Sequence, residues 1–126
     1  MRIFRAVSAA LCGFLLAGCA TVSARPVSTV MVEVDFGPAG RSLVRQVVPV
    51  EPGATLQDAT AMIFPVEKGS VCCDPRETAA IDGVAADPAA NLWWTVSVNG
   101  SKKVSPYKTR LKPGDRVRWE YRRYDQ

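Results

Sequence analysis

The chain has 126 residues, with 16 lysines and arginines against 12 aspartates and glutamates, and it contains no histidine. This length suits one modest globular domain. Because histidine is absent, the commonest general base and the commonest metal ligand are both missing, and no Gly-rich phosphate loop is present. Two of the arginines lie in residues 1–18, so the net charge falls from +4 to +2 without that segment. These features argue against an enzyme, a metal site and a nucleic-acid partner.

The first 18 residues have the pattern of an export signal. The two arginines precede a short apolar stretch over residues 6–17, which is typical of a secretory signal and too short to span a bilayer. The stretch ends in Leu-Ala-Gly-Cys at residues 16–19, which resembles the lipobox of bacterial lipoproteins. That resemblance implies cleavage before Cys19 and a lipid, palmitate included, on this residue. An ordinary signal peptide with an incidental cysteine is the alternative.

The residues after Cys19 bear on location. Lipoproteins that stay in the inner membrane of Gram-negative bacteria usually have aspartate at the next position, and here it is Ala20. We therefore expect a lipid-anchored envelope protein on the outer membrane, facing the periplasm, rather than on the inner membrane. Residues 19–28 comprise the lipidated cysteine and a linker that reaches at most about 30 Å. A single domain over 29–126 would then lie close to the membrane.

The domain opens with a pattern typical of a hairpin. Residues 29–36 alternate apolar and polar side chains, which predicts a half-buried strand. A Gly-Pro-Ala-Gly turn and a second predicted strand at 41–50 follow. Glu33 and Asp35 share the polar face of the first strand, which we interpret as solvated.

One short helix is predicted next. Thr55 suits the N-cap and Asp58 the N3 position of a capping box, and Pro65 ends the helix. An apolar face is predicted to dock on the sheet; it comprises Leu56, Ala59, Met62 and Ile63.

Several strands complete the domain. Short strands are predicted at 78–81 and 92–98, separated by a loop at 84–91, and Asn99-Gly100 is a strong hairpin-turn signal. A last strand at 116–121 would point Val117, Trp119 and Tyr121 inward. The order of hairpin, helix and strands predicts an α+β domain with a mixed sheet of about five strands.

Three segments carry a family resemblance. They are Ile81-Asp82-Gly83, then Trp-Trp-Thr-Val-Ser-Val-Asn-Gly at 93–100, and Leu-Lys-Pro-Gly-Asp-Arg-Val-Arg-Trp-Glu-Tyr at 111–121. Together they resemble the transcobalamin C-terminal-like domain family, over roughly residues 29–124. The resemblance implies a β-grasp-like fold and no enzyme activity. In vertebrate cobalamin carriers the similar domain covers one side of a bound corrinoid, so it also implies a corrinoid as a candidate ligand.

Cys72 and Cys73 depart from that family pattern. In an oxidising compartment two such thiols tend to form disulfides, and we favour a vicinal disulfide, although adjacent Cα atoms lie closer than usual for this bond. Two free cysteines, a metal site and a catalytic thiol are the alternatives. The last two are weakened by the missing histidine.

The remaining candidate contacts lie in the second half of the chain. Trp93 is either a binding contact on an open sheet face or a side chain covered by the loop at 84–91 or by Tyr107. From residue 99 onward nine basic residues face three acidic ones, which indicates either attraction to an anionic surface or a solvated strand face. The candidate ligand or partner contacts are Trp93, Asn99, Tyr107, Arg116 and Arg118.

These observations favour a non-catalytic binding or protein-interaction domain, tethered to a membrane by lipid. Its partner would be an envelope protein or an anionic surface such as lipid headgroups or peptidoglycan. One alternative is a receptor for a small, corrinoid-like molecule. The other is a thiol- or disulfide-active protein that uses Cys72 and Cys73.

Overall fold

The computed structural model describes residue 18, residues 27–70 and residues 73–124. The predicted signal peptide apart from residue 18, Cys19, most of the linker and Cys72 lie outside the described residues. Within the described part of the chain, no helix is long and apolar enough to cross a membrane.

A four-stranded mixed sheet forms the base of the domain. Its strand order is β2-β1-β7-β6, in which β1 pairs with β2 antiparallel and with β7 parallel, and β6 pairs with β7 antiparallel. The first strand therefore lies beside the last, although most of the chain separates them. The four strands are β1 (Ser28–Asp35), β2 (Val44–Val50), β6 (Leu92–Val98) and β7 (Arg116–Arg123).

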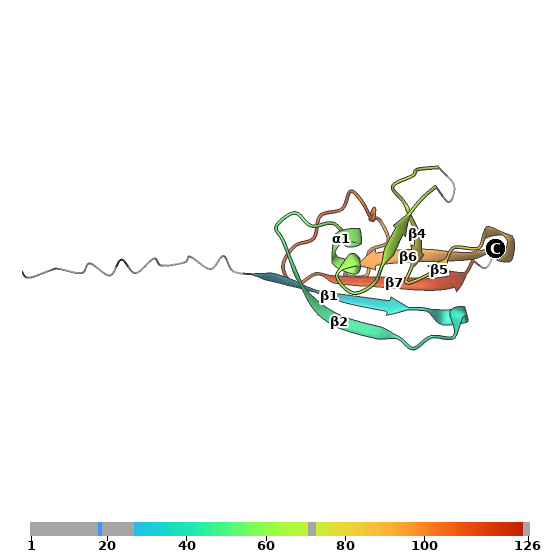
Figure 1. The fold of residues 1–126 in the computed structure, drawn as a ribbon, viewed down its shortest axis with the longest axis horizontal. Coiled ribbons are helices and arrows are strands. Elements are labelled where there is room, and N and C mark those ends of the chain that lie inside the picture. The colour runs from blue at the N-terminus through green and yellow to red at the C-terminus, as the bar shows by residue number, and fades with distance from the viewer. Residues whose placement is uncertain (1–17, 19–26, 71–72, 125–126) are drawn as a thin grey trace, which may run out of the picture.

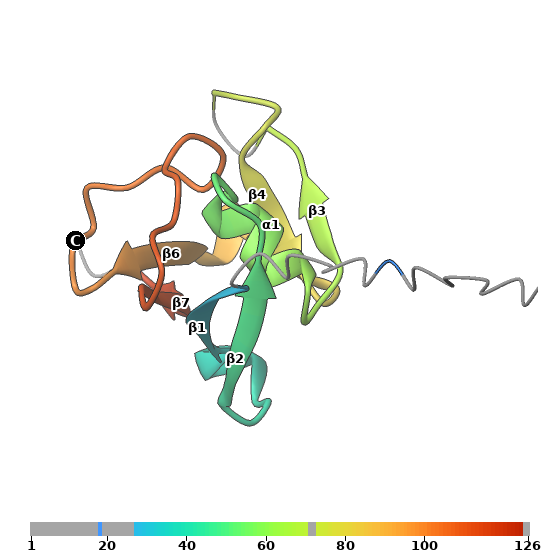
Figure 2. The same ribbon diagram turned by 90° about the vertical axis from the view of Figure 1, so that its left-hand side faces the viewer.

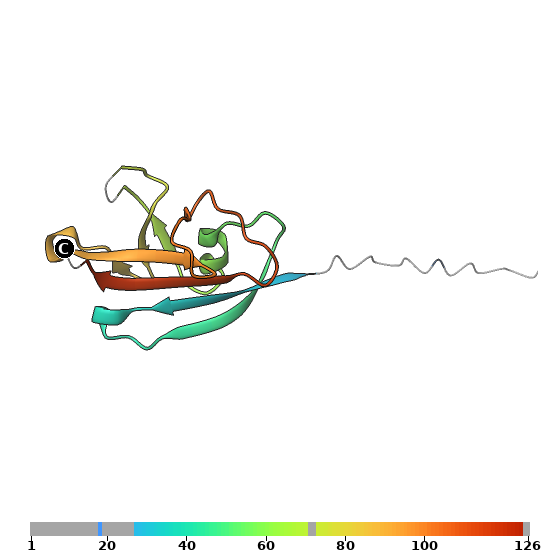
Figure 3. The same cartoon turned by 180° about the vertical axis from the view of Figure 1, so that it is seen from behind.

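The helix and the smaller sheet lie on one side of the four-stranded sheet. Figures 1 and 3 show the helix and a smaller three-stranded sheet on that side, while no described helix or strand covers the other side. The smaller sheet has the order β3-β4-β5. The elements are α1 (Leu56–Ala61), β3 (Val66–Lys68), β4 (Thr78–Ile81), β5 (Val84–Ala85) and the 3-10 turns η1 (Gly37–Ala39) and η2 (Pro88–Ala90).

This arrangement confirms the predicted fold class. An opening hairpin, one short helix and a last strand parallel to the first make a β-grasp-like α+β domain. The strands after the helix divide between two sheets, so the mixed sheet has four strands, and the predicted loop at 84–91 contains β5 and η2. Figure 2 shows β3, β4 and α1 stacked above the hairpin of β1 and β2.

The helix begins as predicted, but the prediction of its buried face was only partly correct. The capping box between Thr55 and Asp58 is present in both directions. Met62, which was expected on the buried face, is 59% exposed, whereas Thr60 is fully buried. Met62 is the C-cap of the helix and keeps helical φ and ψ of −69° and −22°. At about 3.6 residues per turn it therefore lies outside the face that Leu56, Ala59 and Thr60 bury.

The core is centred on Trp119, which is 1% exposed. Its Nε1–H donates to the hydroxyl of Thr60 at 2.8 Å, and its ring meets Trp94 edge to face at a centroid distance of 6.4 Å. Thr60 in turn donates to the carbonyl of Leu56 at 2.8 Å. A polar residue on the helix is therefore buried because it satisfies the indole N–H of the sheet.

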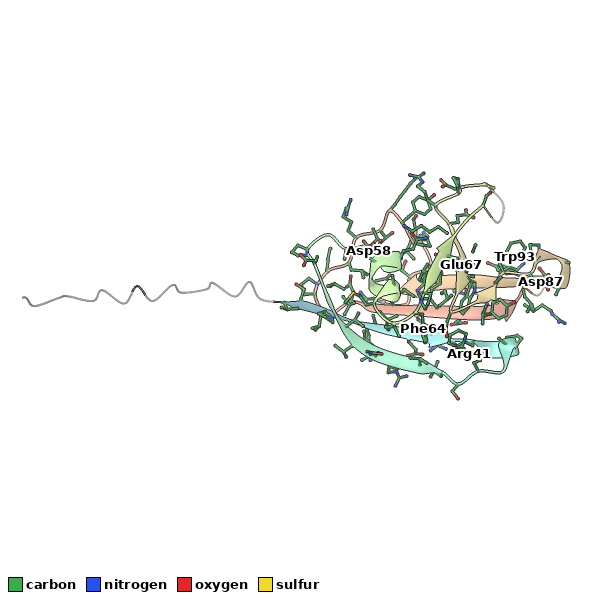
Figure 4. The ribbon with its side chains drawn as sticks, in the orientation of Figure 1. Arg41, Asp58, Phe64, Glu67, Asp87 and Trp93 are labelled. Carbon is green, nitrogen blue, oxygen red and sulfur yellow. The ribbon has the colours of Figure 1, made fainter. Side chains whose placement is uncertain are left out.

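The connection after β1 is fixed by Arg41. Its guanidinium lies 4.2 Å above the Phe36 ring and, as Figure 4 shows, close to Phe64. Arg41 also forms an ion pair with Asp82 in the turn between β4 and β5. The tip of the opening hairpin is thereby attached to the smaller sheet.

Candidate functional site

A groove runs along the outer side of β6 and brings two predicted residues together. Its volume is about 510 Å³, and both Trp93 and Tyr107 line it. Backbone and side chains of β6 form one wall, and residues 104–107 form the opposite wall. Clefts of this size are typical of ligand sites.

Trp93 is half-buried at one end of this groove. Its Nε1–H donates to the side-chain oxygen of Asn91 at 2.9 Å, so the segment before β6 covers part of the ring. Figure 4 shows Trp93 at the same end of the molecule as Asp87, whose backbone pairs with Leu92. Trp93 therefore has features of both interpretations. Its side chain is held by the preceding loop, and it also lines a groove in which it could contact a ligand.

Tyr107 is held in place by two residues that were not among the predicted site residues. The Asp74 carboxylate accepts hydrogen bonds from the Tyr107 hydroxyl at 3.0 Å and from Arg76 Nη2 at 2.7 Å. The Arg76 guanidinium also lies 4.4 Å from the centre of the Tyr107 ring. The signal in the sequence was Asp74-Pro75-Arg76, because an aspartate often caps the backbone N–H two residues later, as it does here at 2.9 Å.

This cluster changes the titration of its members. Hydrogen bonds from the Arg76 side chain and backbone hold the pKa of Asp74 well below its usual range. The hydrogen bond to the Asp74 carboxylate raises the pKa of Tyr107. The tyrosine is therefore a neutral donor at physiological pH, and its hydroxyl is committed to Asp74.

The charge of Asp74 should be visible in the titration of Tyr107. In the Asp74→Asn variant we expect the pKa of Tyr107 to fall toward the ordinary value of about 10, because a neutral amide is a weaker acceptor. The Cζ signals of ¹³C-labelled tyrosines, followed by NMR against pH, measure this. Tyr121 is an internal control, because burial raises its pKa and the substitution leaves that burial intact. An unchanged pKa of Tyr107 would contradict the assignment.

The other three predicted contacts lie together elsewhere. Asn99, Arg116 and Arg118 line a second hollow of about 510 Å³ on the uncovered face of the four-stranded sheet. Asn99 is committed to the turn, because its side chain donates to Asp115 at 2.9 Å and accepts from the backbone of Arg116 at 2.9 Å. The five predicted contacts therefore lie on two separate surfaces.

Arg118 is bound to acidic side chains of its own sheet. It pairs with Glu120 at 2.8 Å, with Asp35 at 3.6 Å and with Glu33. Glu33 also accepts from Arg45 at 3.0 Å and is only 9% exposed. The expectation that Glu33 lies on a solvated face was therefore wrong, because flanking arginines on β2 and β7 cover it. Within the described residues these pairs satisfy Arg118 on its own chain.

The cysteine prediction stays a prediction. Cys72 lies outside the described residues, while Cys73 directly precedes the cluster of Asp74, Arg76 and Tyr107. Among residues 27–70 and 73–124, no group of three or more histidine, cysteine, aspartate or glutamate side chains is placed to hold a metal ion. A third hollow, of about 490 Å³, lies between Pro49 and Met62 and contains none of the predicted residues.

Solved structures share this fold. Haptocorrin in complex with Cbi matches with a TM-score of 0.60 and 14% sequence identity over 77% of this chain. The match spans only 25% of the haptocorrin chain, so this protein corresponds to one part of it. A protein of Ruminococcus gnavus ATCC 29149, named for a proposed metal-binding role, matches with a TM-score of 0.54 and 18% identity, over 78% of this chain and 99% of the other. No curated protein matches the sequence.

The strand order and the single helix define a β-grasp-like α+β domain, whose fold is similar to that of part of haptocorrin. The resemblance that the three sequence segments carried is thereby confirmed at the level of the fold. Residues 53–123 match the model of a family described as a domain of unknown function, DUF4430. The chain belongs to this family.

Proposed function

We propose that this protein is a lipid-anchored, non-catalytic binding domain of the bacterial cell envelope, and that its ligand or partner occupies the groove along β6. The groove is the observation that carries the proposal. It places Trp93 and Tyr107 on one surface, and the cluster around Asp74 holds Tyr107 there before any ligand arrives. A preorganised aromatic wall lowers the entropy lost on binding.

The anchor rests on the sequence alone. The Leu-Ala-Gly-Cys motif at residues 16–19 and Ala20 support lipidation and an outer-membrane location. Metabolic labelling with radioactive palmitate should mark the protein and should fail to mark a Cys19→Ala variant. Equal labelling of both forms would contradict the anchor.

Crosslinking in living cells tests the groove. A photoreactive benzoylphenylalanine at position 107 should yield adducts with an envelope component after illumination. The same residue at position 47, where the exposed Val47 lies on β2 far from the groove, serves as the matched control. Adducts at neither position, or at position 47 alone, would contradict the proposed site.

A corrinoid-like small molecule is the second candidate ligand. The likeness of the fold to haptocorrin, solved in complex with Cbi, favours it, and Trp93 and Tyr107 in the groove are aromatic rings that could pack against a flat corrin ring. Cobinamide at micromolar concentration should then quench tryptophan fluorescence, and Trp93→Ala should reduce the effect. An unchanged emission would contradict this candidate.

A further inference from the structure

The outer edge of β6 is half closed by its own chain. At one end Leu92 exchanges backbone hydrogen bonds with Asp87, both at 2.9 Å. At the other end Val98 exchanges them with Ser101, at 3.0 and 2.9 Å. The two neighbouring segments therefore pair with the ends of the strand and do not pair with its centre.

The centre of this edge presents four backbone groups that have no hydrogen-bond partner in the part of the chain that the structure describes. The N–H of Asn99 points to β7, where it donates to Arg116 at 2.9 Å, so in antiparallel pairing the alternate residues Trp94 and Val96 point away from β7. Among residues 27–70 and 73–124, no hydrogen bond reaches the backbone N–H or C=O of Trp94 or Val96. Both residues line the groove.

This edge lacks the features that usually protect a strand from pairing. The other edge strand of the sheet, β2, contains Arg45 and Pro49, and proline removes a donor and blunts an edge. The seven residues of β6, Leu-Trp-Trp-Thr-Val-Ser-Val, contain neither charge nor proline. The strand is therefore suited to accept one more strand.

The wall of the groove indicates the charge of the partner. Lys102, Lys103 and Lys108 are exposed and form no ion pair within the described residues. Lys102 lines the groove together with one acidic residue, Glu77, and Lys103 and Lys108 flank the wall at residues 104–107 in the sequence. Two copies of this chain paired edge to edge would bring these lysines together and repel, whereas an acidic segment would be attracted.

We propose that the edge of β6 binds an extended, acidic peptide segment of a partner protein as an added strand, through the backbone groups of Trp94 and Val96. Donor and acceptor then alternate with a two-residue repeat of about 6.7 Å, which another peptide backbone matches. Main-chain hydrogen bonds supply affinity in such additions. The inference rests on the proposed function, because it names the class of ligand that occupies the same groove.

A model peptide tests the pairing directly. The probe is a fluorescein-labelled heptapeptide of alternating valine and threonine with an aspartate at each end, titrated with the full-length protein in detergent micelles and followed by anisotropy. Only one side of the peptide backbone faces β6. Two further peptides carry N-methyl groups on every second residue, one at the odd-numbered and one at the even-numbered positions. The peptide whose N-methyl groups face β6 should bind about tenfold or more weakly, since two hydrogen bonds are lost. The other peptide should bind nearly as well as the unmethylated one.

Protein variants supply the matched controls. Val96→Pro removes a donor that faces the groove rather than β7, so it should weaken binding about tenfold while the circular dichroism spectrum stays the same. Lys102→Glu changes an exposed side chain, and it should weaken the preference for the aspartate peptide over a lysine-ended one. Val47→Lys, outside the groove, should change neither.

The outcomes separate the inference from the proposed function. No binding of the aspartate peptide at about 1 mM would overturn the added strand. Equal losses of affinity for the two N-methylated peptides would also overturn it. Self-association that Val96→Pro abolishes would also overturn it, in favour of a second copy. Crosslinks at position 107 would still support the groove in each of these cases, and their absence would contradict the proposed function itself.

Discussion

Replacing Trp119 with alanine is expected to lower the free energy of unfolding by about 4 kcal/mol, which is typical of a large aromatic removed from a core. The side chain is 1% exposed, and its loss leaves a cavity against Trp94 and the hydroxyl of Thr60 without its donor. Urea unfolding followed by circular dichroism measures the change from the midpoint and the slope.

Trp93 provides the matched control for this prediction. It is the same residue type on the neighbouring strand, but it is half-buried and lines the groove. Trp93→Ala should cost only about 1 kcal/mol, while it weakens binding in the groove. Equal losses of stability in the two variants would show that the core is not centred on Trp119.

The difference in burial between Trp119 and Trp93 could be predicted only in part from the sequence. Period-two alternation in the last strand placed Val117, Trp119 and Tyr121 inward, and the structure buries all three. In the adjacent pair Trp93-Trp94, alternation required opposite faces but could not say which face a neighbouring loop would cover. Which face is covered depends on Asn91, because its side chain accepts the hydrogen bond from Trp93 and is placed there by the turn before β6.

The groove itself could not be predicted, because strand order is a long-range property. Asn99-Gly100 is a turn with both residues at positive φ, 50° and 83°, as its signal indicated. The returning chain, however, pairs with β6 only at Ser101 and then leaves the sheet. Because β7 pairs instead with β1 and with the other side of β6, the edge stays open.

The role of Asp74 was missed, and that of Glu33 was misassigned, for a related reason. Asp74 and Glu33 are unremarkable in a sequence with 12 acidic residues. Their roles come from partners far along the chain, since Tyr107 is 33 positions from Asp74 and Arg118 is 85 positions from Glu33. Local patterns reveal caps and turns, but they carry no information about such distant partners.

Gly37 is the position where the smallest change should have a large effect. Its φ is +39°, and a Cβ there would lie 2.4 Å from the backbone oxygen of Tyr121. Since that oxygen belongs to the backbone of β7 and not to a flexible side chain, Gly37→Ala must displace either the turn η1 or β7. We expect a loss of about 3 kcal/mol, combining the unfavourable φ with this displacement.

Gly40 in the same turn makes the prediction specific. Its φ is +73° and no atom lies within 4 Å of its would-be Cβ, so Gly40→Ala should cost only about 1 kcal/mol, from the backbone conformation alone. Thermal or urea unfolding of both variants measures the difference. The displacement should also reach the groove, because Tyr121 lies opposite Trp94 in the β6–β7 pairing. Amide NMR signals of Trp94 should therefore shift in Gly37→Ala and stay in place in Gly40→Ala; equal spectra and equal stabilities would contradict the close approach of Gly37 to β7.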